Sequence, residues 1–100
     1  MFLFTNTKEN SKVVLTTKSN TSRQLTITCD CSNSRDTVLH VSVKDPSFQD
    51  VKHYSANINA PKGKATFSIN FAENDPTGVW QITIKNVTNN SIATLKHTLK

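Results

Sequence analysis

Two cysteines, Cys29 and Cys31, are the side chains best suited to metal or redox chemistry, and a single residue separates them. In a β-strand both side chains point to one face, about 6.6 Å apart along the strand. The Cβ atoms of a disulfide lie ~3.8 Å apart, so we do not expect these two thiols to pair within a regular strand. A structural zinc site needs four ligands, and the sequence has no second Cys cluster. We interpret both cysteines as buried thiols that pack as small apolar groups, with a bond to a cysteine outside this chain or across a dimer as the alternative.

The histidines and acidic residues do not form a metal-ligand pattern either. His40, His53 and His97 fall on three different predicted strands with no shared spacing. The acidic residues contain no D-x-D-x-D calcium motif. Some of the aspartates near predicted strand ends could still gather around a calcium ion in the loops at one end of the fold, namely Asp30, Asp36, Asp45 and Asp75. The sequence therefore favours no metal site and implies no cofactor.

Nothing in the sequence assembles a nucleophile or a phosphate-binding loop. A G-x-S-x-G nucleophile elbow is missing. The two glycines, Gly63 and Gly78, are too far apart to form a glycine-rich loop around a phosphate. We therefore predict that the chain is not an enzyme and has no hydrolase, transferase or redox activity.

Three Asn-x-Ser/Thr sequons begin at Asn20, Asn86 and Asn89, each in or beside a predicted turn. They are possible glycosylation sites if the chain passes through a secretory pathway. Because Asn, Ser and Thr are abundant in this sequence, a few such sequons are also expected by chance.

The chain is basic, with 12 Lys and Arg against 7 Asp and Glu, a net charge of +5 and a pI near 9.5. Such a balance fits either a polyanionic partner or a solvated basic surface. We favour the solvated surface, because the lysines are scattered singly, no run of five basic residues occurs and no aromatic residues are interleaved with them. We expect no nucleic-acid partner and no tight binding to duplex DNA.

No apolar run approaches the ~20 residues of a membrane-spanning helix, so we expect no membrane insertion by this chain. Residues 1–6 are too short for a signal peptide and lack its basic start. A length of 100 residues fits one domain. We expect that domain to span residues 1–100 and to have been excised from a larger protein.

Apolar and polar residues alternate with a period of two along most of the chain, whereas helical spacing is not sustained. Turn-forming residues separate the alternating runs, which we predict as strands at 12–17, 23–31, 37–44, 51–58, 65–71, 79–85 and 92–99. In the sixth run Trp80 is in phase with Ile82 and Ile84, so we expect it to anchor the core. Strands with one dry face and regular turns predict an all-β fold, an immunoglobulin-like antiparallel β-sandwich of about seven strands.

The stretch from residue 41 to 85 carries a resemblance. It reads VSVKDPSF and, after an alternating strand, KATFSINFAENDPTGVWQITIKN. An Asp-Pro turn followed downstream by a Gly-x-Trp strand entry resembles two groups of extracellular domains. One is the β-sandwich after the von Willebrand A domain in calcium-activated chloride channel regulators, and the other is the macroglobulin-like domain of the complement and α-macroglobulin family. The matching residues are Asp45, Pro46, Gly78 and Trp80.

Residues 25–37, LTITCDCSNSRDT, also resemble the strand and turn before the sandwich core of the first group. The separation between Asp36 and Asp45 is shorter than in that group, which predicts a missing or reorganised strand. The resemblance implies an extracellular accessory module and transfers no catalytic residue.

These observations favour a non-catalytic structural or interaction module of a secreted or cell-surface protein. Such a module would contact neighbouring domains or another protein through its loops or through a sheet face. The alternative is a stand-alone adhesin or lectin-like binding domain.

Overall fold

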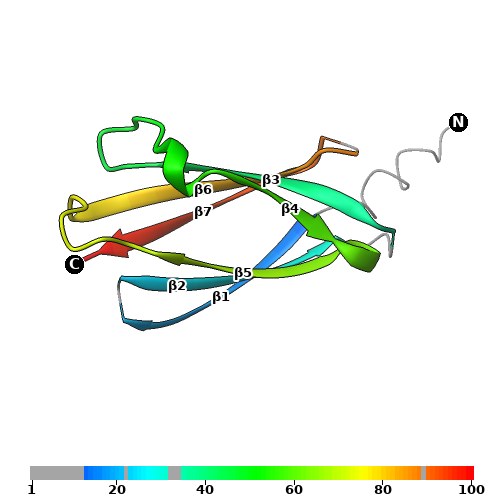
Figure 1. The fold of residues 1–100 in the computed structure, drawn as a ribbon, viewed down its shortest axis with the longest axis horizontal. Helices are drawn as coiled ribbons and strands as arrows, with labels where there is room; N and C mark the ends of the chain where they lie inside the picture. The colour runs from blue at the N-terminus through cyan, green and yellow to red at the C-terminus, as the bar shows by residue number, and fades with distance from the viewer. Residues whose placement is uncertain (1–12, 22, 32–34, 89) are drawn as a thin grey trace, which may run out of the picture.

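In a computed structural model, most of the chain forms β-strands, as the alternation of apolar and polar residues predicts (Figure 1). The structure describes residues 13–21, 23–31, 35–88 and 90–100. They form seven strands and two short 3-10 helices: β1 (Val13–Thr21), β2 (Gln24–Cys31), β3 (Thr37–Lys44), η1 (Lys52–Tyr54), β4 (Ala56–Ala60), η2 (Pro61–Gly63), β5 (Lys64–Asn70), β6 (Gly78–Asn86) and β7 (Ile92–Leu99).

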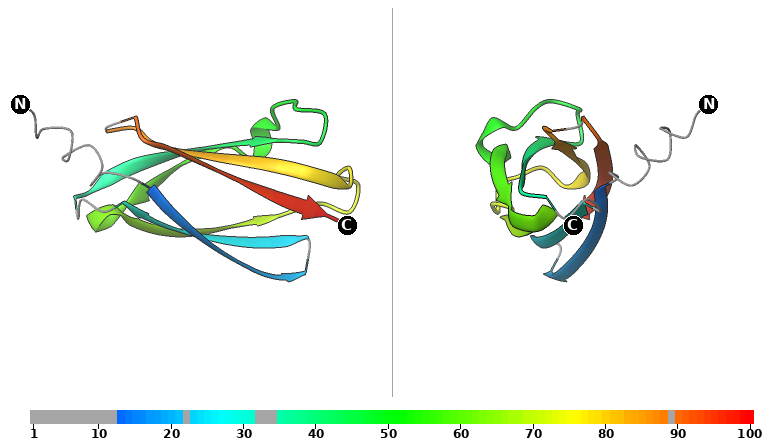
Figure 2. Two further views of the ribbon diagram at one scale, coloured as in Figure 1. Left: turned by 180° about the vertical axis from the view of Figure 1, so that it is seen from behind. Right: turned by 90° about the vertical axis from the view of Figure 1, so that its right-hand side faces the viewer.

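The strands form two sheets that pack face to face (Figure 2). One sheet has the strand order β1-β2-β5 and the other has the order β4-β3-β6-β7. All neighbouring strands within the sheets are antiparallel. The predicted immunoglobulin-like antiparallel sandwich is thus confirmed. No helix among the described residues is long and apolar enough to cross a membrane.

Two strands, β3 and β7, begin and end where the alternation predicts, at 37–44 and 92–99. The prediction of a strand at 51–58 is wrong for its first half, because η1 occupies that part of the chain and β4 starts after it. The backbone turns there, with the Tyr54 amide donating to the Val51 carbonyl oxygen at 3.1 Å. The turn brings the Tyr54 ring against aromatic residues of the core.

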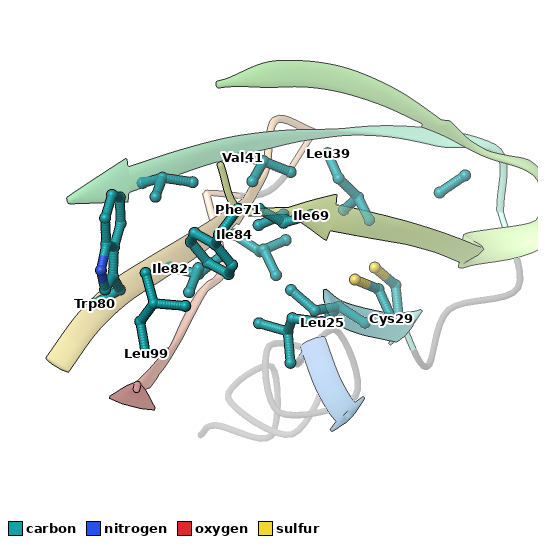
Figure 3. Close-up of a cluster of buried hydrophobic side chains, with 14 residues drawn as sticks. Leu25, Cys29, Leu39, Val41, Ile69, Phe71, Trp80, Ile82, Ile84 and Leu99 are labelled. Atoms are coloured by element: carbon teal, nitrogen blue, oxygen red, sulfur yellow. The ribbon is translucent and has the colours of Figure 1, made fainter. Parts of the chain in front are cut away.

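The core lies between the two sheets and is filled by inward-facing residues of both (Figure 3). Trp80 is only 1% exposed, so its expected role in the core is confirmed. The rings of Phe71 and Tyr54 meet it edge to face, with centroids 5.0 and 6.1 Å from that of Trp80. Such edge-to-face contacts add stability beyond buried area. The indole Nε1 donates to the Pro76 carbonyl oxygen at 2.9 Å, which satisfies the polar atom of this large side chain.

The two cysteines belong to this core. Cys29 and Cys31 are buried on the inner face of β2, and both are free thiols, as the sequence predicts. Burial raises the pKa of Cys29 from its ordinary value of 9.0 to about 11, and the neighbouring Cys31 adds to the rise. Burial likewise raises the pKa of Cys31. Both thiols therefore stay protonated near neutral pH and pack as apolar groups.

Replacing Trp80 by alanine should lower the free energy of unfolding by about 3–5 kcal/mol, since it opens a cavity among the aromatic rings. Urea denaturation followed by circular dichroism measures the change. The matched control is Val79→Ala at the preceding residue, which is 48% exposed. This control should cost less than about 1 kcal/mol. Equal losses for the two variants would contradict the assignment of Trp80 to the core.

The buried thiols should react slowly with a soluble aromatic disulfide reagent. The rise in the pKa of Cys29 from 9.0 to about 11 reduces its thiolate fraction about 100-fold, and burial blocks access to both thiols. Absorbance at about pH 8 should therefore show two equivalents of thiol reacting in urea and at least a ~100-fold slower reaction in buffer. Rapid reaction of the folded protein would show that β2 is open or bulged at the cysteines.

Candidate interaction surface

The four residues that carry the resemblance lie at one end of the sandwich. Asp45 and Pro46 follow β3, whereas Gly78 opens β6, which is hydrogen-bonded to β3. Gly78 has a φ of +130°, and a Cβ atom there would lie 3.0 Å from the Cγ of Pro46. The position needs glycine both for its backbone conformation and for this close approach. Trp80 lies two residues further along β6, so the Asp-Pro turn and the Gly-x-Trp entry are one packed unit.

The loop from β3 to η1 is closed by its own hydrogen bonds. The Asp45 side-chain oxygen Oδ1 accepts from the amides of Ser47 at 2.8 Å and Gln49 at 3.1 Å. The Asp45 amide donates to the Gln49 carbonyl oxygen at 3.0 Å, and its carbonyl oxygen accepts from the Phe48 amide at 2.9 Å. Asp45 thus holds the backbone of this loop from Ser47 to Gln49 through its side chain and its main chain.

Phe48, at the tip of this loop, is 67% exposed and has a φ of +64°. A bulky residue rarely adopts the left-handed region, which costs roughly 1–2 kcal/mol. The hydrogen bonds around Asp45 hold the backbone in this conformation. The exposed Val79 follows Gly78 in β6, next to the Pro46–Gly78 contact, so it adds apolar surface at this end of the strand. The loop therefore presents an aromatic ring to solvent from a fixed backbone.

The neighbouring loop between β5 and β6 is anchored by Asp75. Its Oδ2 atom accepts hydrogen bonds from the Tyr54 hydroxyl and, at 2.8 Å, from the Ala72 amide. Arg23, the residue before β2, donates to the Ala72 carbonyl oxygen and so attaches the loop to the start of that strand. Burial and the contact with Asp75 raise the pKa of Tyr54. This carboxylate is engaged in holding a loop over the aromatic core.

The four aspartates considered for calcium do not meet. Asp36 precedes β3, where its Oδ1 atom accepts from the Lys62 amide at 2.8 Å, whereas Asp45 follows the same strand. Asp30 lies on β2, opposite Lys64 in the register with β5. Within the described ranges no three His, Cys, Asp or Glu side chains are grouped to hold a metal ion.

The histidines are likewise apart. His40 lies on the outer face of β3, with Nδ1 2.8 Å from Oδ1 of Asn57 on β4. His53 belongs to η1, and His97 on β7 stacks on Phe71 with an interplanar angle of 9°. Each ring therefore has a local packing or hydrogen-bonding role.

The sequon at Asn86 does not fit a glycan in the folded domain, which corrects the expectation for this residue. Asn86 is fully buried, and its Oδ1 accepts from the Thr37 hydroxyl at 2.7 Å and from the Thr88 amide at 3.0 Å. Its Nδ2 atom, the atom that a glycan would modify, is also buried. The side chain of Asn20 and all of Asn89 lie outside the described residues.

The fold also assembles a surface that the sequence analysis missed, the outer face of the four-stranded sheet. None of the four strands of this sheet contains Asp or Glu. The pairing of β6 with β3 and β7 brings outward-facing polar and basic side chains together: His40, Ser42, Lys44, Gln81, Thr83, Lys85, Thr94 and Lys96. We call these eight residues the basic sheet face. The sequence did contain a signal for this face: the residues of each strand that alternate with the core residues, and so point outward, include no Asp or Glu.

Comparisons with known proteins do not add a family assignment. No protein-family model matches the chain, and no curated protein matches it. The resemblance to the two groups of extracellular sandwich domains therefore stays a prediction that depends on Asp45, Pro46, Gly78 and Trp80.

Proposed function

We propose that this chain is a non-catalytic interaction module of a secreted or cell-surface protein, which contacts a neighbouring domain or another protein through its β3–η1 loop. The observation that carries the proposal is Phe48, an exposed aromatic residue in an unfavourable backbone conformation. Backbone strain of this kind persists where the surrounding structure imposes it, often at functional sites.

The local chemistry supports a binding role. Aromatic side chains inserted into a partner supply much of the free energy of many interfaces. A loop whose conformation is already fixed loses little entropy on binding. Around Phe48 the hydrogen bonds of Asp45 provide that order.

The side chains most suited to catalysis have other roles in this fold. Cys29 and Cys31 are enclosed in the core. The carboxylates of Asp45 and Asp75 accept hydrogen bonds from loop backbone amides. These roles support a module that presents a surface rather than one that turns over a substrate.

If Phe48 is kept for binding, replacing it should not harm the fold. Asn tolerates the left-handed region, so Phe48→Asn should be more stable than Phe48→Ala by about 0.5–1 kcal/mol and at least as stable as the wild type. Both variants lose the ring, so urea denaturation isolates the backbone contribution. A loss of more than about 1 kcal/mol in both variants would show that the ring stabilises the domain itself.

Contact through the loop can be tested with a photo-crosslinking amino acid at position 48 of the natural full-length protein. The control position is Lys62, also exposed and also at positive φ (+55°), but in η2 at the opposite end of the sandwich. Irradiation should give a defined crosslink to a neighbouring domain or a partner protein at position 48 and not at position 62. Mass spectrometry identifies the product. Equal or absent crosslinking at the two positions would contradict the proposal.

A further inference from the structure

We propose that the basic sheet face binds an anionic polysaccharide bearing sulfate or carboxylate groups. This surface is distinct from the Phe48 loop, and the inference does not depend on the function proposed for that loop. It follows from three properties of the face: its one-signed charge, the spacing of its lysines and the hydroxyl groups between them.

The first property is charge. Lys44 and Lys96 are exposed and Lys85 is half-buried, and within the described residues none of them forms an ion pair. Asp50 is an acidic residue that approaches the face, since it forms a β-bridge with Lys44 at the loop end. The face therefore presents a positive potential over most of its area, and this favours a polyanion.

The second property is spacing. In the register, Lys44 and Lys96 flank Gln81 on the two strands beside β6. Strands lie about 4.8 Å apart, so these two lysines are about 10 Å apart at their Cα atoms. Lys85 lies four residues beyond Gln81 on β6, about 13 Å along the strand. Charges this far apart on one flat face match a long polymer with repeated anionic groups better than a single small anion.

The third property is the polar surface between the lysines. Ser42, Thr83 and Thr94 form a row across β3, β6 and β7, and the Oγ1 atoms of the two threonines are 3.3 Å apart. Hydroxyl groups both donate and accept hydrogen bonds, as sugar hydroxyls do. The strands supply no Phe, Tyr or Trp to this outer face on which a nucleobase could stack. The chemistry therefore favours a polysaccharide over a single-stranded nucleic acid.

Two triple variants of equal charge test the proposal against a simple effect of net charge. The test variant is Lys44→Gln/Lys85→Gln/Lys96→Gln. The control is Lys18→Gln/Lys62→Gln/Lys64→Gln, which changes exposed lysines outside the basic sheet face. Each variant removes three positive charges and lowers the net charge from +5 to +2. Far-UV circular dichroism and urea midpoints establish that both remain folded.

Binding is measured by surface plasmon resonance on immobilised heparin, which carries sulfate and carboxylate groups, and on immobilised alginate, which carries carboxylate groups alone. At about 0.15 M NaCl the test variant should bind at least one of them 10-fold or more weakly than the wild type. Its affinity should also fall less steeply as the salt concentration rises, which is the lower salt slope expected when fewer charges are neutralised. The control should stay within about threefold of the wild type. Equal weakening of both variants, or no binding of the wild type to either polymer, would overturn the proposal.

Two further measurements complete the test. Thr83→Val keeps the β-branched shape and the charge but removes a hydroxyl group, so it should weaken polysaccharide binding a few-fold without changing the salt slope. Duplex DNA, immobilised to the same total negative charge, should bind more weakly than the preferred polysaccharide at the same salt concentration. Tighter binding of DNA would contradict the proposed polysaccharide and indicate a nucleic acid as the partner.

Discussion

The position of β6 between β3 and β7 is the constraint on which the rest of this structure depends. Its register with both neighbours decides which residues enter the core and which form the outer face. Because side chains alternate along a strand, a shift of one residue would expose Trp80 and bury Lys85. The large difference in solvation between these two side chains therefore holds the register in place. Core packing and the composition of the basic sheet face are two results of the same pairing.

The end of the sandwich that holds the β3–η1 and β5–β6 loops depends on that pairing indirectly, through Trp80. Trp80, fixed on β6, packs with Phe71 and Tyr54 from two different segments and donates a hydrogen bond to the loop before Gly78. Asp75 and Asp45 then close the two loops above this aromatic cluster through backbone amides. A rigid base under both loops is what allows Phe48 to remain exposed on a fixed backbone.

The sequence predicted the sandwich well because period-two alternation is a local property. It gave both ends of β3 and β7 and the burial of Trp80 and the two cysteines. It failed before β4, where Tyr54 continues the alternation although the backbone forms a 3-10 turn to pack its ring. The positive φ of Phe48 has no signature in its residue type. The sequence also did not predict that Lys44, Lys85 and Lys96 share one face. They are far apart in the chain, and only the strand pairing brings them together.

The first and last strands have a further consequence for mechanical load. Val13 pairs with Cys31 at one end of the sandwich, whereas Leu99 pairs with Gly78 at the other. A pulling force applied to β1 and β7 therefore acts along the strands and loads all the hydrogen bonds of a pair in shear at once. Opening such a pair requires many bonds to break together rather than one after another. Force applied at Val13 and Leu99 would therefore have to shear β1 from β2 or β7 from β6 before the sandwich could open.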